Sequence, residues 1–436
     1  MKNMLAAALA LALGAAAPAA AEPIEIQWWH AMTSVNGERI NKIAADFNAR
    51  QSDYKVVPVF KGSYAETMTA AIAAYRAGNA PDIVQVFEVG TATMMAAKGA
   101  IKPVYQLMAD AGEPFDPASY LPAVTAYYST ADGKMLSLPF NSSTPVVYWN
   151  KEAFKKAGLD PDKPPQTWPE TFAAAEKLRG AGLPCGFTSA WVSWVQIENF
   201  SAWHNIPIAT KANGLEGPDA VLEFNNPTVV RHVTNLANAQ KDKSFDYSGR
   251  TTEPEPRFIS GDCGMIQDSS AAYGMFKKGA KFAFGVTELP YYPDVKGAPQ
   301  NSIIGGASLW VMAGKKPEKY KGIAKFFNYL SGVPVQEKWH EDTGYLPITK
   351  AAYEATKASG FYEKNPGTEV AILQMTNKPP TENSRGLRFG NMVQIRDIIA
   401  EELESAFSGK ATPPAALDNA VNRGNGLLRQ FQRNAQ

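Results

Sequence analysis

The sequence has little of what metal centres and nucleophilic catalysis require. It contains two cysteines and four histidines among 436 residues. No histidine has a second one four residues away, and the acidic residues after His340 are typical of a solvated helix end. There is no G-x-S-x-G nucleophile elbow, no P-loop and no G-x-G-x-x-G after a strand. These absences argue against the common zinc, serine-hydrolase and nucleotide-dependent enzymes, and we expect neither a metal nor another cofactor.

An excess of charge of either sign is also absent. Lys and Arg number 43 and Asp and Glu number 42. This balance argues against broad electrostatic capture of nucleic acid or of an anionic membrane, although it is compatible with a local basic pocket. The hydrophobic content of 45% is that of a globular protein. Because the length exceeds what one hydrophobic core holds, we expect two or more lobes.

Long apolar runs are missing except at the N-terminus. Residues 4–17 are almost entirely Ala, Leu and Gly, a run of about 14 residues that is shorter than the roughly 20 needed to span a bilayer. Lys2 precedes the run, and Ala19–Ala21 form an A-x-A cleavage pattern. The pattern predicts a cleaved signal peptide, residues 1–21, and a mature protein that is exported to the periplasm. No cysteine follows the run, which argues against a lipid anchor.

The two cysteines, Cys185 and Cys263, leave two interpretations open. In an oxidising compartment an even count allows one disulfide. Two buried thiols that serve as small hydrophobic side chains fit the sequence equally well, because spacing alone does not decide.

Strand and helix patterns alternate along the mature chain. Strand-like segments occur at 24–29, 54–60, 83–87 and 146–149. Helical spacing occurs around 40–47, 65–77, 226–242, 391–408 and 413–433. This order predicts an α/β fold with parallel strands and crossover helices, and the length predicts two such lobes. Ligands of these folds bind at the carboxyl ends of strands or between lobes.

Polar residues stand where several of these strands begin or end. Glu88 follows the strand 83–87, and Ser143 lies in a polar run before the strand 146–149. Ser269 lies beside Asp268, where a strand gives way to a helix. Each position fits ligand binding, and each also fits ordinary loop or helix-capping chemistry.

Three further features are ambiguous in the same way. Gly306 would let a ligand approach the backbone closely, or would form a bulge. Arg396 lies on an apolar helix face, so it requires either an internal carboxylate or a ligand anion. Nine tryptophans, among them Trp191, suit the C–H faces of a polyol or a quaternary ammonium group, or they pack in the core.

Several long strings resemble a known family, the family 1 extracellular solute-binding proteins of ABC importers. The strings shared with the wider family are Ala77–Ile83, Tyr148–Leu159, Pro164–Trp168 and Gly344–Lys350. Throughout its mature length the chain is similar to the glycerol-3-phosphate-binding branch of that family, which serves the Ugp importers. The strings that carry this second likeness are Lys61–Tyr64, Val86–Met95, Pro139–Pro145, Ile303–Met312 and Gly386–Met392.

The resemblance implies the periplasmic-binding-protein type of fold, in which crossing hinge strands join two α/β lobes around a ligand. It implies an N-lobe of residues 22–140 and 306–344 and a C-lobe of residues 141–305 and 345–436. The positions that match the ligand contacts of the family are Tyr64, Glu88, Ser143, Trp191, Ser269, Gly306, Tyr345 and Arg396.

Tyr64 and Glu88 match positions that bind the polyol. From its chemistry we assign Arg396, together with Ser269, mainly to the phosphate. Asp268 departs from the expected pattern, because an acid near a phosphate is unfavourable unless it points away or meets a cationic headgroup. That acid keeps glycerophosphocholine among the expected ligands.

The resemblance further implies a receptor, not an enzyme. We expect it to capture sn-glycerol-3-phosphate or a glycerophosphodiester and to deliver the ligand to the membrane subunits of an ABC importer, with lobe closure as the functional step and no nucleic acid as partner. Two rivals are a receptor for a neutral sugar and an exported phosphodiesterase or glycosidase. Glu152 and Glu170 could be proposed as glycosidase carboxylates, but the sequence gives no spatial pairing for them.

Overall fold

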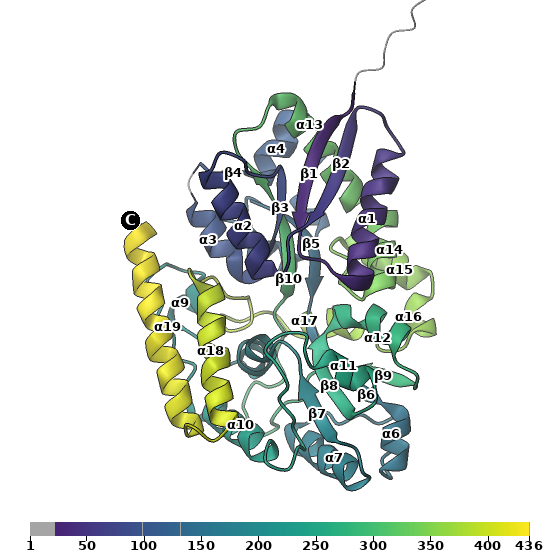
Figure 1. Cartoon of the computed structure of the whole chain (residues 1–436), viewed down its shortest axis with the longest axis vertical. Helices are drawn as coiled ribbons and strands as arrows, with labels where there is room; N and C mark the ends of the chain where they lie inside the picture. The colour runs from purple at the N-terminus through teal and green to yellow at the C-terminus, as the bar shows by residue number, and fades with distance from the viewer. Residues whose placement is uncertain (1–21, 98, 131, 436) are drawn as a thin grey trace, which may run out of the picture.

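The computed structural model describes residues 22–97, 99–130 and 132–435, and the predicted signal peptide lies outside these ranges. Two sheets with helices packed around them form two lobes, one above the other in Figure 1. We call the upper part, around the first sheet, the N-lobe and the lower part the C-lobe. Within the described ranges no helix has both the length and the apolar character needed to cross a membrane.

The N-lobe sheet has six strands in the order β2-β1-β3-β10-β4, with β5 paired to β10. The strands are β1 (Ile24–His30), β2 (Tyr54–Phe60), β3 (Ile83–Phe87), β4 (Ile101–Lys102), β5 (Leu138–Ser143) and β10 (Gly305–Met312). β1 runs parallel to β2 and β3, whereas β10 is antiparallel to its three neighbours. Parallel neighbours need crossover connections, which are α1 (Ser34–Asn48) and α2 (Tyr64–Arg76). The carboxyl ends of β1, β2 and β3 therefore share one edge of the sheet.

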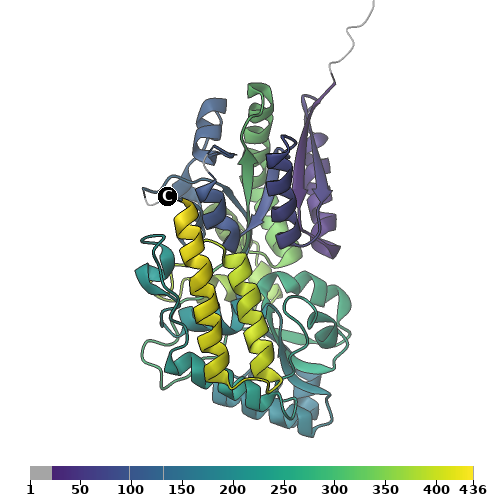
Figure 2. The ribbon, with the colours of Figure 1, turned by 60° about the vertical axis from the view of Figure 1, so that its left-hand side comes forward.

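The C-lobe sheet has four strands in the order β7-β8-β6-β9. They are β6 (Pro145–Asn150), β7 (Cys185–Ser189), β8 (Cys263–Ser269) and β9 (Phe284–Thr287). Its larger helices are α7 (Trp168–Gly180), α10 (Pro227–Ala239), α18 (Met392–Phe407) and α19 (Pro413–Ala435). α18 and α19 lie side by side along the C-lobe, and α19 rises to the level of the N-lobe (Figure 2).

The remaining helices complete both lobes. They are α3 (Thr91–Ala96), α4 (Val104–Ala111), α5 (Pro122–Tyr128), α6 (Lys151–Lys156), α8 (Phe200–Trp203), α9 (Thr210–Gly214), α11 (Glu255–Ile259), α12 (Tyr273–Gly279), α13 (Pro317–Ser331), α14 (Val333–Thr343), α15 (Lys350–Ala358), α16 (Phe361–Lys364) and α17 (Val370–Met375). The segment Trp194–Asn199 (η3) is a π-helix, for which the sequence patterns predicted no element.

The chain passes between the lobes where β5 ends and β6 begins, with Thr144 as the one residue between them. β10 leads back to the N-lobe sheet, and its first residue, Gly305, lies opposite Ser143 of β5. Two antiparallel strands thus cross side by side between the lobes. The predicted α/β fold with two lobes is confirmed.

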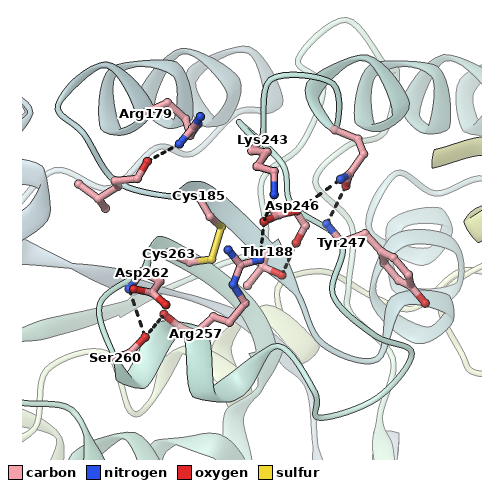
Figure 3. Close-up of polar contacts among 12 residues, drawn as sticks. Arg179, Cys185, Thr188, Lys243, Asp246, Tyr247, Arg257, Ser260, Asp262 and Cys263 are labelled. Atoms are coloured by element: carbon pink, nitrogen blue, oxygen red, sulfur yellow. Dashed lines mark hydrogen bonds and ion pairs between the residues drawn. A yellow bond between two sulfur atoms is a disulfide. The ribbon is translucent and has the colours of Figure 1, made fainter. Parts of the chain in front are cut away.

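Cys185 and Cys263 form a disulfide, which resolves the alternative that the sequence left open. The two residues lie directly opposite each other in the parallel pair β7 and β8, which brings their Cα atoms to 4.5 Å. Figure 3 shows the bridge beside an ion pair between Asp246 and Arg257. Asp246 also lies 3.6 Å from the Lys243 ammonium group. These links hold together one end of the C-lobe sheet.

Candidate functional site

Two of the predicted site residues stand at the carboxyl edge of the N-lobe sheet. Tyr64 is the first residue of α2, and a reciprocal capping box between Ser63 and Glu66 fixes that helix start. Glu88 directly follows β3 and begins a short 3-10 turn. The Tyr64 ring stacks on Phe87, with centroids 5.4 Å apart and planes inclined by 7°. The end of β3 therefore brings Tyr64 and Glu88 into one region of the lobe.

Tyr64 shares a polar cluster with Tyr345 and Asn141. The Asn141 Nδ2 donates to the Tyr64 hydroxyl at 2.8 Å, and Gln85 Nε2 donates to Asn141 Oδ1 at 2.8 Å, which orients the amide. The Tyr345 ring stacks on Trp339, with centroids 5.3 Å apart. Burial raises the pKa of Tyr64 well above its usual value, and the neighbouring Tyr345 hydroxyl adds to the shift. Both phenols therefore remain neutral and can donate hydrogen bonds.

Ser143 and Ser269 lie at the crossing between the lobes. Ser143 ends β5, and the carbonyl of the next residue, Thr144, accepts a hydrogen bond from Ser270 N at 2.9 Å. Ser269 ends β8, and its Oγ accepts from Ala271 N at 3.1 Å, so it caps the turn that follows. Each serine is thus one residue away from the backbone hydrogen bond that joins the two strand ends.

Gly306 and Tyr345 belong to the same crossing. Gly306 lies opposite Ser142 on the neighbouring strand and has a φ of +92°. A Cβ atom there would stand 1.8 Å from the Asn141 carbonyl oxygen, so only glycine fits. Leu346 N donates to the Ser142 carbonyl at 2.7 Å, which places Tyr345, one residue earlier, beside the crossing.

Arg396 of α18 lies between two carboxylates from different lobes. Its Nε and Nη2 donate to Glu198 Oε1 and Oε2 at 2.8 and 2.7 Å, and Nη2 also donates to Glu88 Oε1 at 2.5 Å. The three side chains are nearly buried, with exposed fractions of 14% for Arg396, 3% for Glu88 and 1% for Glu198. Burial by itself would lower the pKa of Arg396, but the charges of Glu198 and Glu88 outweigh it and raise that pKa. Burial raises the pKa of Glu88, and Arg396 opposes that rise.

This cluster bears on the role expected of Arg396. The sequence leaves an internal carboxylate or a ligand anion as its partner, and its chemistry leads us to expect mainly the phosphate. The structure gives Arg396 two carboxylates, so the three groups together carry one net negative charge when all are ionised. A phosphate would meet that charge unfavourably, which argues against assigning Arg396 mainly to the phosphate, and its role stays a prediction.

Asp268 also differs from the expectation built on its charge. Its side chain is fully buried, Oδ1 accepts from Ser269 N at 2.6 Å, and Oδ2 has no partner among the described residues. Burial raises the pKa of Asp268 to about 8. Burial, followed by the charge of Asp268, raises the pKa of Glu255 to about 9. Burial therefore favours the neutral form of Asp268, which weakens the repulsion of a phosphate that its charge would cause.

Trp191 is the predicted site residue with the fewest links to the others. It has a φ of +48°, its N–H donates to the Thr251 carbonyl at 2.9 Å, and its ring packs on a cluster that includes Trp194. The Trp194 ring itself lies close against the first residue of β10, Gly305. A Cβ atom at Gly305 would stand 2.5 Å from that ring. The structure thus connects Trp191 to the crossing through Trp194.

Sequence reasoning missed two residues that position this site. Glu198 holds Arg396, and Asn141 holds the Tyr64 hydroxyl. Glu198 had a signal, because it is the one charged residue of the segment 194–200, and an acid that is buried with such a segment requires a cation or a donor. Asn141 had none beyond its place in a polar run.

Comparison with known proteins places the chain in a family. A family model described as "Bacterial extracellular solute-binding protein" matches residues 42–370. The sn-glycerol-3-phosphate-binding periplasmic protein UgpB of Pectobacterium atrosepticum is 54% identical over 432 residues, 99% of this chain and 97% of the relative. The protein of the same name from Escherichia coli O6:K15:H31 is 52% identical over 438 residues, with 100% of both chains covered.

Solved structures show the same fold at lower identity. UgpB from Mycobacterium tuberculosis in complex with glycerophosphocholine is 22% identical, with a TM-score of 0.78 over 94% of this chain and 99% of that one. Maltose-bound MalE3 of T. maritima is 17% identical, with a TM-score of 0.73 over 94% and 100%. With the family model covering most of its length and relatives above 50% identity, the chain belongs to the bacterial extracellular solute-binding proteins.

Proposed function

We propose that this chain is the periplasmic binding protein of an ABC importer and that it captures sn-glycerol-3-phosphate or a glycerophosphodiester such as glycerophosphocholine. Relatives that are 52–54% identical over nearly the whole chain are named for glycerol-3-phosphate binding. The observation that carries the proposal is the division of the site into a charged group and a neutral, hydroxyl-rich group. The chain delivers its ligand to the membrane subunits of the importer and breaks no bond.

The charged group, Glu88 with Arg396 and Glu198, suits the glycerol end. Nη1 of Arg396 makes no hydrogen bond to a described residue, and neither does Oε2 of Glu88. The Arg396 side chain is 14% exposed and the Glu88 side chain 3%, so the cluster is not completely closed to solvent. One free donor beside one free acceptor matches two adjacent hydroxyls, each of which accepts from the guanidinium or donates to the carboxylate.

The neutral group suits the phosphate. We assign to it the hydroxyls of Tyr64, Ser143, Ser269 and Tyr345 together with the Gly306 backbone. These groups offer hydrogen-bond donors to phosphate oxygens and carry no negative charge, because the phenols stay neutral. In this proposal the glycerol end lies at Arg396 and the phosphate lies at the neutral group. This is the reverse of the orientation in which Arg396 binds the phosphate. We place Trp191 in the cleft beside the ligand and assign it to neither group.

Ligand capture then follows from lobe closure. Glu88 and Tyr64 come from the N-lobe, whereas Arg396 and Ser269 come from the C-lobe. A ligand that contacts both sets stabilises the closed arrangement by contacts made only there. We keep the predicted boundaries, 22–140 with 306–344 against 141–305 with 345–436, as the proposed moving bodies.

Calorimetric titration of sn-glycerol-3-phosphate, glycerophosphocholine and maltose tests this function. We expect saturable binding of one or both phosphorylated ligands, no binding of maltose, and recovery of the diester intact by mass spectrometry. Binding of maltose alone would make the protein a sugar receptor. Release of choline from the diester would make it a hydrolase.

A further inference from the structure

We propose that Glu198 is a positioning residue for ligand binding: it fixes the Arg396 guanidinium so that one edge of that group faces the glycerol hydroxyls. The proposal rests on the function proposed above and adds a residue that the family resemblance did not supply. Glu198 is expected to contact Arg396 and not the ligand.

The contacts of the guanidinium leave only one edge free. Glu198 accepts from both Nε and Nη2, at 2.8 and 2.7 Å, which is the two-pronged geometry that sets the plane of an arginine side chain. Glu88 takes the second hydrogen of Nη2. Nη1 then remains, with no hydrogen bond to a described residue. The plane set by Glu198 therefore decides where Nη1 points.

Glu198 is itself held by an unusual local structure. Ser193 Oγ donates to Glu198 Oε1 at 3.0 Å, across five positions of the chain. In an α-helix the neighbours on one face are three or four residues apart, whereas the π-helix Trp194–Asn199 brings the fifth residue round. Asn199 Nδ2 also donates five residues back, to the Trp194 carbonyl at 3.2 Å. The π-turn thus creates the contact that orients the carboxylate.

The same segment is tied to the crossing strands. Asn199 Oδ1 accepts from Ile303 N at 2.9 Å, two residues before β10 begins. The hydrogen bond consequently ties the segment that carries Glu198 to the start of β10, where Gly306 of the neutral group lies. A rigid link of this kind sets the separation between the glycerol and phosphate ends of the site.

Without Glu198, Arg396 would keep one carboxylate, Glu88, from the opposite lobe. The guanidinium can then turn so that Nη1 and Nη2 both donate to Glu88. That contact would occupy Nη1 of Arg396 and Oε2 of Glu88, the donor and the acceptor that the ligand hydroxyls need. We therefore expect the loss of Glu198 to weaken recognition of the hydroxyls and to leave recognition of the phosphate unchanged.

The test compares two ligands on the variant Glu198→Gln, which keeps the shape and removes the charge. The probes are sn-glycerol-3-phosphate and n-propyl phosphate, which has the same chain and no hydroxyls. We expect the variant to lose about tenfold or more in affinity for glycerol-3-phosphate. Its affinity for n-propyl phosphate should match that of the wild type. A smaller loss in the same direction is expected for Ser193→Ala, which leaves all charges in place.

Glu404→Gln is the matched control. Glu404 lies on the same helix as Arg396 and holds Arg250 by the same two-pronged contact, at 2.8 and 2.7 Å. It should leave both affinities unchanged. If Glu198→Gln loses the same affinity for both ligands, Glu198 has a merely structural role. If it loses no affinity for either ligand, Glu198 has no role in binding. Either result overturns the proposal.

Two further results are distinguishable. If Glu198→Gln does not fold, as judged by circular dichroism, the Ser193→Ala titrations decide between the same outcomes. If the wild type binds neither phosphorylated probe, the proposed function fails and the positioning role fails with it. If the wild type binds glycerol-3-phosphate and both variants bind it with the same affinity, the proposed function stands and only the positioning role fails.

Discussion

Helix α18 takes part in two arginine–glutamate pairs with the same geometry and different surroundings. Arg396 with Glu198 and Arg250 with Glu404 both show Nε–Oε1 at 2.8 Å and Nη2–Oε2 at 2.7 Å. The exposed fractions are 14% and 1% in the first pair, against 38% and 35% in the second. Exposed pairs contribute little to stability, whereas breaking a buried pair leaves a charge without water or partner. The two pairs therefore differ in their exposure to solvent and not in their hydrogen-bond geometry. Exposure is what distinguishes the site residue from the surface contact.

The buried pair also has a third member. Glu88 joins it from the opposite lobe, so that negative charge exceeds positive charge there when all three groups are ionised, in a region with little water. An arrangement chosen for stability alone would balance these charges or replace them with apolar side chains. The surplus carboxylate is better explained by an acceptor that a ligand hydroxyl uses.

Arg396→Ala has the largest expected effect. It removes the donor at the glycerol end and leaves Glu88 and Glu198 buried together without a cation. We expect the free energy of binding of glycerol-3-phosphate to become less favourable by roughly 2–5 kcal/mol. The free energy of unfolding should fall by roughly 3–5 kcal/mol. Titration and urea unfolding measure the two quantities. Arg250→Ala is the control and should leave binding intact; unchanged affinity in Arg396→Ala would remove Arg396 from the site.

Glu88→Gln separates function from stability within the buried group. The neutral amide keeps the shape of the side chain and loses the charged acceptor, so affinity for glycerol-3-phosphate should fall by roughly 1.5–3 kcal/mol. Because the variant also removes the surplus negative charge, the free energy of unfolding should stay the same or rise. Urea unfolding beside the titration tests both halves. A variant that is destabilised and yet binds normally would make Glu88 a structural residue.

Much of the fold could be predicted from local patterns, and the site only in part. Periodicity placed β1 and α18 to within two residues, because each buries one continuous apolar face. The polar residue after β3, Glu88, could be picked out because parallel strands end at the binding edge of such sheets. Its partner could not, since Glu88 and Arg396 are 308 positions apart and meet only when the two lobes come together.

Other features were hidden for related reasons. The π-helix that carries Glu198 has no apolar period of its own, because every residue from Trp194 to Asn199 is buried. The disulfide stayed undecided because Cys185 and Cys263 become neighbours only through the pairing of β7 with β8. The charge expected of Asp268 was misleading because the sequence shows the residue type and not its burial.

Asp268→Asn extends the comparison to a buried acid that makes no ion pair with any residue the structure describes. Burial raises the pKa of Asp268 to about 8, so the folded protein holds a proton that the unfolded chain releases near pH 4. Between those values a rise in pH favours the unfolded state, by up to about 1.4 kcal/mol for each pH unit. The stability of the wild type relative to Asp268→Asn should therefore fall from pH 5 to pH 7. Parallel unfolding curves at both pH values would show that Asp268 is ionised in the fold.

The same variant bears on the ligand. Because burial favours the neutral form of Asp268, Asp268→Asn should leave binding of both glycerol-3-phosphate and glycerophosphocholine close to that of the wild type. Titration at pH 7 with each ligand checks this. A selective loss for the choline ester would restore Asp268 as a partner of the cationic headgroup.

The smallest effect is expected for Glu404→Gln, the exposed member of the comparison. Its loss of the Arg250 contact should lower the free energy of unfolding by about 0.2–1 kcal/mol, and high salt should reduce the difference further. The hydrogen bond from Arg250 lowers the pKa of Glu404, so the stabilising contribution is present at neutral pH and disappears as the pH falls through that lowered value. This dependence has the opposite sign to that of Asp268, and urea unfolding at pH 7 and pH 3, with and without salt, measures it. A loss of several kcal/mol at neutral pH, insensitive to salt, would show that the two pairs on α18 differ in something other than their access to water.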